Sequence, residues 1–264
     1  MSADQDVRGW AELLRENWDS FARSRYRDFF VASHRGWDDP ETWKAQAEFD
    51  AAIVLHELDP ERLRGFDVLE VGCGVGRLAL VVAPRVRSYT GFDLAPRMVE
   101  EARVRCSRLE HARFFVGDGL SVPSPAADRP YALAFALAVF IHCPREVIRS
   151  MIASVHEILS PGGEFRFQLR ADASDPTGIR PVEEAPIDVE PPRREEGALS
   201  AAEVRALGEI EAATKDRYYM GHAFRHAEVE PFVGAAAPGA RLRVLRFGRD
   251  DLYVDLGRPE TASR

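Results

Sequence analysis

The fold is decided by residues 68–79, VLEVGCGVGRLA, where an apolar run leads into three glycines at alternate positions. The run predicts a β-strand at 67–71, and the residues after the glycines predict a helix near 76–83. Glycine tolerates positive φ and lets a ligand approach the backbone. The first turn of a helix presents free N–H groups. We therefore expect a ligand-binding turn at the carboxyl end of this strand.

The spacing of the glycines separates three kinds of ligand-binding turn. A dinucleotide fold needs G-x-G-x-x-G, whose third glycine falls at the position of Arg77. A Walker loop ends in G-K-[ST], which does not occur here. The observed pattern, E-x-G-x-G-x-G from Glu70 to Gly76, resembles the class I S-adenosylmethionine-dependent methyltransferases. In that family the turn holds the methionine and ribose part of the cofactor, S-adenosyl-L-methionine.

On either side of this turn, short apolar runs alternate with amphipathic stretches, which is typical of βαβ units and a parallel sheet. We expect further strands at 88–92, 113–117, 131–137, 164–169, 241–247 and 251–256, and helices near 96–108, 144–159, 200–214 and 226–236. The resemblance implies an α/β fold with a Rossmann-like, doubly wound sheet. It would have seven strands in the order 3-2-1-4-5-7-6, the last strand antiparallel.

Acidic residues follow the second and third predicted strands. Asp93 can accept hydrogen bonds from both ribose hydroxyls, and Asp118 resembles the family residue that bonds the adenine amino group. Met98 either packs near the adenine or belongs to the core. The cofactor-binding residues that the resemblance implies are Glu70, Gly72, Cys73, Gly74, Gly76, Asp93, Leu94, Met98, Asp118, Gly119, Ala136 and Leu137.

The turn after the fourth predicted strand holds the candidate catalytic residue. Small-molecule methyltransferases of this class often carry x-H-x-P here, which His142 and Pro144 match, and L-x-P-G-G after the next helix, as at 159–163. The family's usual aspartate near the strand start is replaced by Ala132. The reaction is an in-line methyl displacement that depends mainly on alignment. His142 either acts as general base or packs under the next helix.

The chain is expected to have two parts. Residues 1–64 read as an N-terminal helical cap rich in aromatic residues, with a helix opening at Asp39-Pro40. Residues 65–264 form the predicted methyltransferase domain, with a proline- and glutamate-rich insertion at 172–199 that we expect to be a lid or loop. The candidate acceptor pocket comprises Trp18, Tyr26, Trp37, Tyr218, Tyr219 and His222. The alternative for the aromatic residues is that they only pack their helices against the sheet domain.

Composition narrows the class of partner. A net charge of -8 disfavours a surface that grips nucleic acid, and the longest apolar run, 131–141, is too short to cross a bilayer. Three scattered cysteines argue against a disulfide framework. His222 and His226 lack the third ligand of a zinc site, so we expect no metal.

These features predict a cytoplasmic methyltransferase, monomer or homodimer, that acts on a small-molecule acceptor without nucleic acid or membrane partners. The alternatives are a catalytically silent cofactor-binding regulatory or scaffold protein and an RNA or protein methyltransferase.

Overall fold

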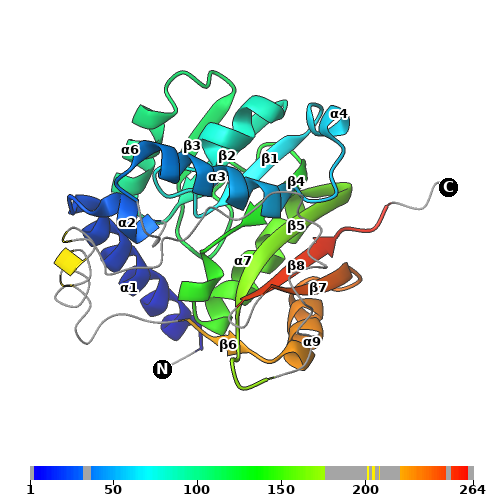
Figure 1. The fold of residues 1–264 in the computed structure, drawn as a ribbon. Helices are drawn as coiled ribbons and strands as arrows, with labels where there is room; N and C mark the ends of the chain where they lie inside the picture. Colours follow the sequence, from blue (N-terminus) through cyan, green and yellow to red (C-terminus); the bar gives the residue numbers. More distant parts are fainter. Residues whose placement is uncertain are drawn as a thin grey trace.

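The computed structural model describes residues 3–31, 37–175, 221–247 and 251–260, together with Ala201, Val204, Arg205 and Gly208. Their centre is one mixed β-sheet with helices on both faces (Figure 1). The strands are β1 (Asp67–Val71), β2 (Ser88–Asp93), β3 (Ala112–Val116), β4 (Tyr131–Ala136), β5 (Leu159–Ala171), β6 (Ala223–Phe224), β7 (Arg241–Phe247) and β8 (Asp251–Gly257).

The order along the sheet is β3-β2-β1-β4-β5-β8-β7. β8 runs antiparallel to β5 and β7, and the other pairs along this path are parallel. The predicted order and antiparallel strand are confirmed, but the predicted count of seven is too low, because β6 adds an eighth strand parallel to the end of β5. β6 is two residues long, so its sequence shows no period-two pattern that could announce it.

The helices are α1 (Ala3–Arg23), α2 (Arg27–Val31), α3 (Pro40–Leu55), α4 (Pro60–Leu63), α5 (Ala79–Val82), α6 (Pro96–Arg105), α7 (Arg145–Ile158) and α9 (His226–Ala236). The predicted start of α3 is confirmed, because the Asp39 carboxylate accepts the Thr42 N–H at 2.7 Å. α5 starts later than the sequence suggests, since 74–78 form a turn. The predicted helix at 200–214 and all but 172–175 of the predicted lid lie outside the regions described continuously.

The helices form two layers because the buried strands present alternate residues to opposite faces. On β4, Leu133 and Phe135 join the core beneath α3, α4, α5 and α6. Ala134 and Ala136 join the core formed with α7 and α9. β4 is buried almost throughout, which explains its nearly continuous apolar sequence.

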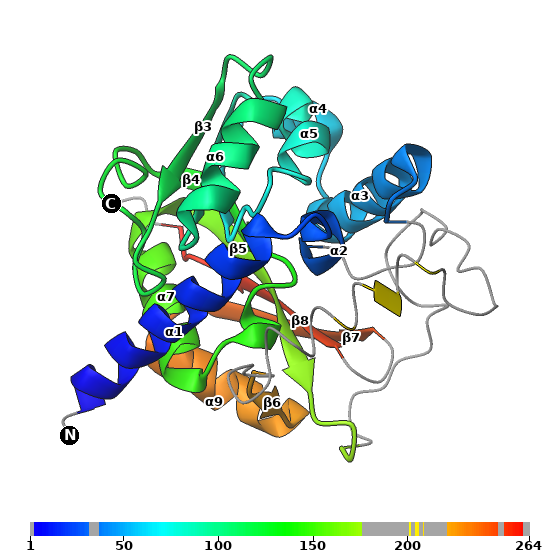
Figure 2. The ribbon, with the colours of Figure 1, turned by 90° about the vertical axis from the view of Figure 1, so that its left-hand side faces the viewer.

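α1 and α2 lie over one end of this sheet, whereas α3 and α4 belong to the helical layer on one of its faces. α1 contacts α6 on one face and α7 on the other, and therefore crosses the edge between the two helical layers (Figure 2). Leu14 of α1 packs into the core on the α7 side, while Phe21 packs with Met98 of α6. α1 and α2 are thus placed where the carboxyl ends of the parallel strands meet.

Candidate active site

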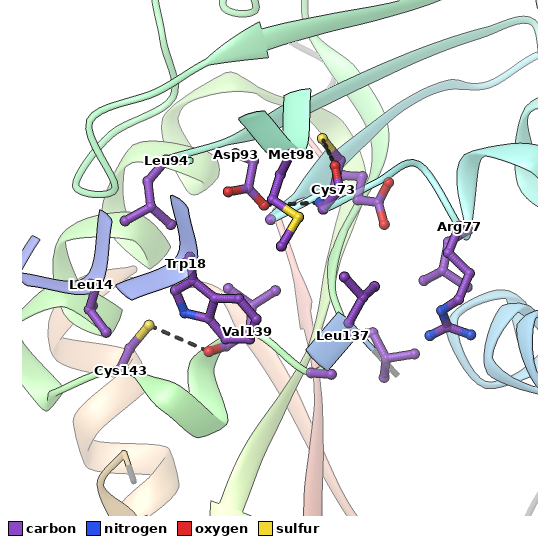
Figure 3. Close-up of a pocket in the computed structure, with 16 residues that line it drawn as sticks. Leu14, Trp18, Cys73, Arg77, Asp93, Leu94, Met98, Leu137, Val139 and Cys143 are labelled. Atoms are coloured by element: carbon purple, nitrogen blue, oxygen red, sulfur yellow. Dashed lines mark hydrogen bonds between the residues drawn. The ribbon is translucent and has the colours of Figure 1, made fainter. Parts of the chain in front are cut away.

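A cavity of about 710 Å³, partly open to solvent, lies at the carboxyl ends of β1, β2 and β4 (Figure 3). Open α/β sheets bind ligands at this edge, where the chain leaves neighbouring strands in opposite directions. The lining residues are Leu14, Trp18, Val31, Glu70, Gly72, Cys73, Gly74, Arg77, Leu78, Asp93, Leu94, Met98, Leu137, Ala138, Val139 and Cys143.

The glycine-rich turn forms one wall of the cavity. Gly72 has φ +71°, and a Cβ there would lie 2.5 Å from Val139 Cγ2, so a side chain is excluded on both counts. Gly76, predicted to contact cofactor, does not line the cavity. A Cβ on Gly76 would lie 2.8 Å from Cys106 Sγ, so this glycine lets α6 pack against the turn.

Asp93 ties the glycine-rich turn to the end of β2. Its buried carboxylate accepts the Gly74 N–H and the Ala95 N–H, each at 2.9 Å. Burial raises the pKa of Asp93 above its ordinary value, although these backbone hydrogen bonds oppose the rise. A carboxylate has about four lone-pair sites, so roughly two remain for hydroxyl groups of a ligand in the cavity. The arrangement fits a ribose.

Glu70 and the residues that follow β4 also line the first cavity. Tyr89 Oη donates a hydrogen bond to Glu70, and burial raises the pKa of Glu70 to about 8. Leu137, predicted to bind cofactor, lines the cavity beside Ala138. Ala138 has φ +57°, a conformation that is rare outside glycine, and its N–H donates to Gln168 Oε1 at 2.8 Å. Ala136 lies outside this lining, fully buried in the core.

A second cavity of about 420 Å³ reaches Gly119 and shares six lining residues with the first: Leu14, Gly72, Asp93, Leu94, Val139 and Cys143. Gly119, a predicted cofactor-binding residue, therefore lies beside the site. The exposed Asp118 carboxylate, predicted to bond the adenine amino group, accepts the Leu120 and Ser121 N–H groups through Oδ1, both at 2.8 Å. It closes its own turn because such short loops favour an aspartate that bonds the following backbone.

Trp18 forms the third wall, and His142, the candidate catalytic residue, packs behind it without lining either cavity. Their rings are 5.3 Å apart at 70°, and Trp18 lines the cavity. His142 is half-buried, and burial, with a smaller contribution from Arg170, lowers its pKa to about 4. The imidazole is therefore neutral at pH 7, as a proton acceptor must be.

The segment that begins at Gly221 packs on the turn that carries His142. The His222 N–H donates to the Cys143 carbonyl at 3.2 Å, and a Cβ on Gly221 would lie 2.0 Å from the Ile141 oxygen. The His222 ring turns away from the cavity lining: its Nε2 is 3.0 Å from Arg145 Nη1. An arginine donor fits a neutral His222, whose pKa is lowered by burial and by Arg145.

The remaining predicted pocket residues lie elsewhere. Tyr26 and Trp37 pack edge to face, 5.8 Å apart, in the aromatic cluster of α1 and α2, and neither lines the cavity. The Tyr26 hydroxyl accepts a hydrogen bond from Arg205 Nε at 3.0 Å. Tyr218 and Tyr219 lie outside the described residues.

Four lining residues were not predicted from the sequence: Leu14, Val31, Leu78 and Arg77. Ala138, Val139 and Cys143 belong to the turn at 138–143 that the sequence singled out through His142. Leu14 and Val31 reach the cavity only because α1 and α2 fold over it, which no local pattern announces. The sequence did contain an indication for Arg77. A charged residue directly follows the third glycine, at a position where a small or apolar residue would be enough to start a helix. Among the described residues, no three His, Cys, Asp or Glu side chains cluster as metal ligands.

Comparison with known proteins finds similarity in the same region. The family described as "Methyltransferase domain" matches residues 68–163. A demethylmenaquinone methyltransferase of Tropheryma whipplei (strain Twist) is 33% identical over 103 residues, 38% of this chain and 40% of that protein. A malonyl-[acyl-carrier protein] O-methyltransferase of Serratia marcescens is 30% identical over 138 residues, 50% of this chain and 51% of that protein.

A solved structure extends the likeness to most of the chain. Magnesium protoporphyrin IX methyltransferase from Synechocystis PCC 6803 with bound SAM has a TM-score of 0.57 at 16% identity, covering 94% of this chain and 96% of that one. This likeness concerns the fold. The sequence matches, by contrast, span about half or less of the two curated relatives. No helix among the described residues is long and apolar enough to cross a membrane.

Proposed function

Because this chain contains a class I S-adenosylmethionine-dependent methyltransferase domain, we propose that it transfers a methyl group from S-adenosyl-L-methionine to a nucleophile on a small molecule. The observation that carries the proposal is the buried Asp93 carboxylate, held by Gly74 and Ala95 at a cavity whose far wall is Trp18. Small-molecule acceptors are supported by curated relatives named for ubiquinone biosynthesis and demethylmenaquinone.

The chain's own residues account for cofactor binding. The Asp93 carboxylate accepts the ribose hydroxyls with the lone pairs that Gly74 and Ala95 leave free. Leu94 and Gly119 border the adjoining cavity, which takes the adenine. Gly72 and Gly74 let the ligand lie against the backbone of the turn. When bound, the cofactor supplies an activated methyl group on a sulfonium centre.

The other walls orient the acceptor and exclude water. Trp18 presents apolar surface on the side of the first cavity away from Arg77 (Figure 3), and Leu14 and Val139 present apolar surface to both cavities. An apolar or aromatic acceptor fits there, and holding it against the methyl group is worth about 7–11 kcal/mol of the barrier. Closure by α1 keeps water from the reacting centre. The neutral His142 ring, packed on Trp18, takes the proton of an acceptor that holds one.

The test is transfer of label from methyl-tritiated S-adenosylmethionine in the presence of a mixture of phenols, carboxylic acids, amines and quinols. The expected result is label in the small-molecule fraction, together with S-adenosylhomocysteine, and loss of both in the Asp93→Asn variant. Parallel reactions contain total RNA or unfolded protein. Label in those fractions alone would contradict the acceptor class, and cofactor binding without transfer to any acceptor would favour a regulatory role.

A further inference from the structure

Gln168 of β5 is a buried polar side chain that the proposed chemistry does not use. Its Oε1 accepts the Ala138 N–H at 2.8 Å, and its Nε2 donates to Asp251 Oδ1 at 2.7 Å. The amide is oriented from both ends, because a backbone N–H needs an acceptor and a carboxylate needs a donor. The side chain therefore links three separate parts of the chain: β5, the turn after β4 and the first residue of β8.

The hydrogen bond to Ala138 is made where the backbone is strained. Ala138 has φ +57°, and in this left-handed conformation the Cβ of an L-residue lies too close to the following carbonyl oxygen. Such a conformation persists only when the surrounding structure imposes it. The half-buried N–H of Ala138 would also lose its acceptor if the Gln168 amide were removed. Both effects would let the turn relax to another conformation.

The conformation of Ala138 determines where one wall of the cavity lies. Ala138 and Val139 both line the cavity. Val139 packs so closely on Gly72 that a Cβ added to this glycine would lie 2.5 Å from Val139 Cγ2. A rotation of the backbone at Ala138 would move Val139 off this contact and change the shape of the cavity.

The same face of β5 approaches the turn at a second point. Arg170 is two residues after Gln168, so both side chains leave the strand on one face. Arg170 lies near enough to His142 to contribute to the lowered pKa of that imidazole. The end of β5 is therefore placed along the turn from Ala138 to His142.

We propose that Gln168, oriented by Asp251, is a positioning residue for methyl transfer: it holds Ala138 in its left-handed conformation and so fixes the wall that borders the reacting groups. This inference rests on the proposed function. Gln168 lines neither cavity, so it acts through the turn and not by contact with cofactor or acceptor. A misplacement of about 1 Å can lower the rate of a reaction on the order of 10²-fold.

The first experiment compares Gln168→Leu with the parent, because leucine is of similar size but accepts no hydrogen bond. For the acceptor that takes up label, kcat should fall about 10- to 100-fold. Affinity for S-adenosylhomocysteine should change by less than about threefold, since Asp93 keeps both of its backbone partners. Gln46→Leu is the matched control: it removes a Gln–Asp hydrogen bond of 2.8 Å within α3, outside the lining of either cavity, and should keep the parent's kcat. A parent-like kcat in Gln168→Leu, or equal losses of kcat and affinity, would overturn the inference.

A second experiment exchanges the donor and the acceptor, which separates positioning from general stability. At pH 8, Gln168→Glu places a second carboxylate against Asp251, so kcat should fall. Adding Asp251→Asn supplies an NH₂ donor to the new carboxylate, which still accepts the Ala138 N–H, so most of the lost kcat should return. A folded double variant without this recovery would overturn the role of Gln168. This pair of variants also serves if Gln168→Leu does not fold.

Hydrogen exchange over residues 134–143 reports on the turn without any acceptor. Exchange at Ala138 should be faster in Gln168→Leu than in the parent, and should slow again from Gln168→Glu to the double variant. Parent-like exchange in Gln168→Leu would show that Gln168 does not hold the turn and would overturn the inference. Failure of the parent protein to methylate any acceptor, with these exchange differences present, would instead overturn the proposed function.

Discussion

Asp93 is the residue on which cofactor binding most depends, and Asp93→Asn tests it with little change in size. The substitution replaces one carboxylate oxygen by an NH₂ group. Oδ1 accepts from Ala95 and Oδ2 from Gly74, both at 2.9 Å. Whichever way the amide turns, one backbone N–H faces another donor. The turn after β1 and the end of β2 therefore lose one of the contacts that hold them together.

The expected cost follows from these contacts. A hydrogen bond to a charged group contributes about 1.5–3 kcal/mol, so the free energy of unfolding should fall by about that amount. For a chain of this size the melting temperature should fall by roughly 3–12 °C. Loss of one ribose acceptor should weaken S-adenosylhomocysteine binding roughly 10- to 100-fold.

The assay is calorimetric titration at a temperature where the variant is folded, beside thermal melting. Asp128→Asn is the control, because Asp128 is an exposed partner of Arg113 and Arg129, remote from the cavity lining. The control should bind S-adenosylhomocysteine as the parent does, and its loss of stability should be within about 1 kcal/mol. Parent-like affinity in Asp93→Asn would refute the role of this carboxylate.

Three further predictions address the other walls of the cavity. Gly72→Ala places a Cβ at positive φ and 2.5 Å from Val139, so it should cost about 2–4 kcal/mol of stability and weaken S-adenosylhomocysteine binding. The control, Gly234→Ala in α9, has open space around it and should be neutral or stabilising. Equal melting temperatures for the two variants would contradict the predicted steric and backbone strain at Gly72. The pKa of Glu70 is raised to about 8, so its contribution to stability is present at low pH and is lost as pH rises through that value. Glu70→Gln should therefore gain stability over the parent by up to about 3 kcal/mol between pH 6 and pH 9 in denaturant titrations, and a pH-independent difference would show that Glu70 ionises normally. His142→Phe keeps the ring on Trp18 but removes the base, so turnover of an acceptor that holds its proton should fall about 10²–10⁴-fold with unchanged S-adenosylhomocysteine affinity. Because the pKa of His142 is lowered to about 4, the parent's rate should show no inflection near pH 6.5, and an unchanged rate in the variant would make His142 structural.

Local sequence patterns predicted the seven strands of the main path and the glycine-rich turn, although β5 begins at Leu159, five residues before its predicted start. β1 and β7 begin and end at the predicted residues, because buried parallel strands and hairpins carry strong apolar signals. β6 is too short to have a pattern, and it forms because the backbone beyond Gly221 is held against the turn at 140–143.

The candidate site was predictable where one turn determines a residue's place, and not where distant segments meet. Gly72, Asp93 and Leu94 line the cavity because strand ends meet at one edge of the sheet. Asp118 and Gly76 match the same family pattern but have further local roles. The Asp118 carboxylate accepts a backbone N–H of its own turn, and Gly76 lets α6 pack against the glycine-rich turn. Leu14 depends on how α1 crosses the sheet edge, which is a tertiary contact, whereas Trp18 on the same helix was among the predicted acceptor residues and lines the cavity.

The measurement that tests the central claim most directly is a crystal structure with S-adenosylhomocysteine bound. It should show both ribose hydroxyls on the Asp93 carboxylate, the adenine beside Leu94 and Gly119, and the sulfur facing the wall formed by Trp18. The apolar space beyond the sulfur should then be bordered by Leu14 and Val139. A ligand bound away from Asp93, or with its sulfur buried against the glycine-rich turn, would contradict methyl transfer in this cavity.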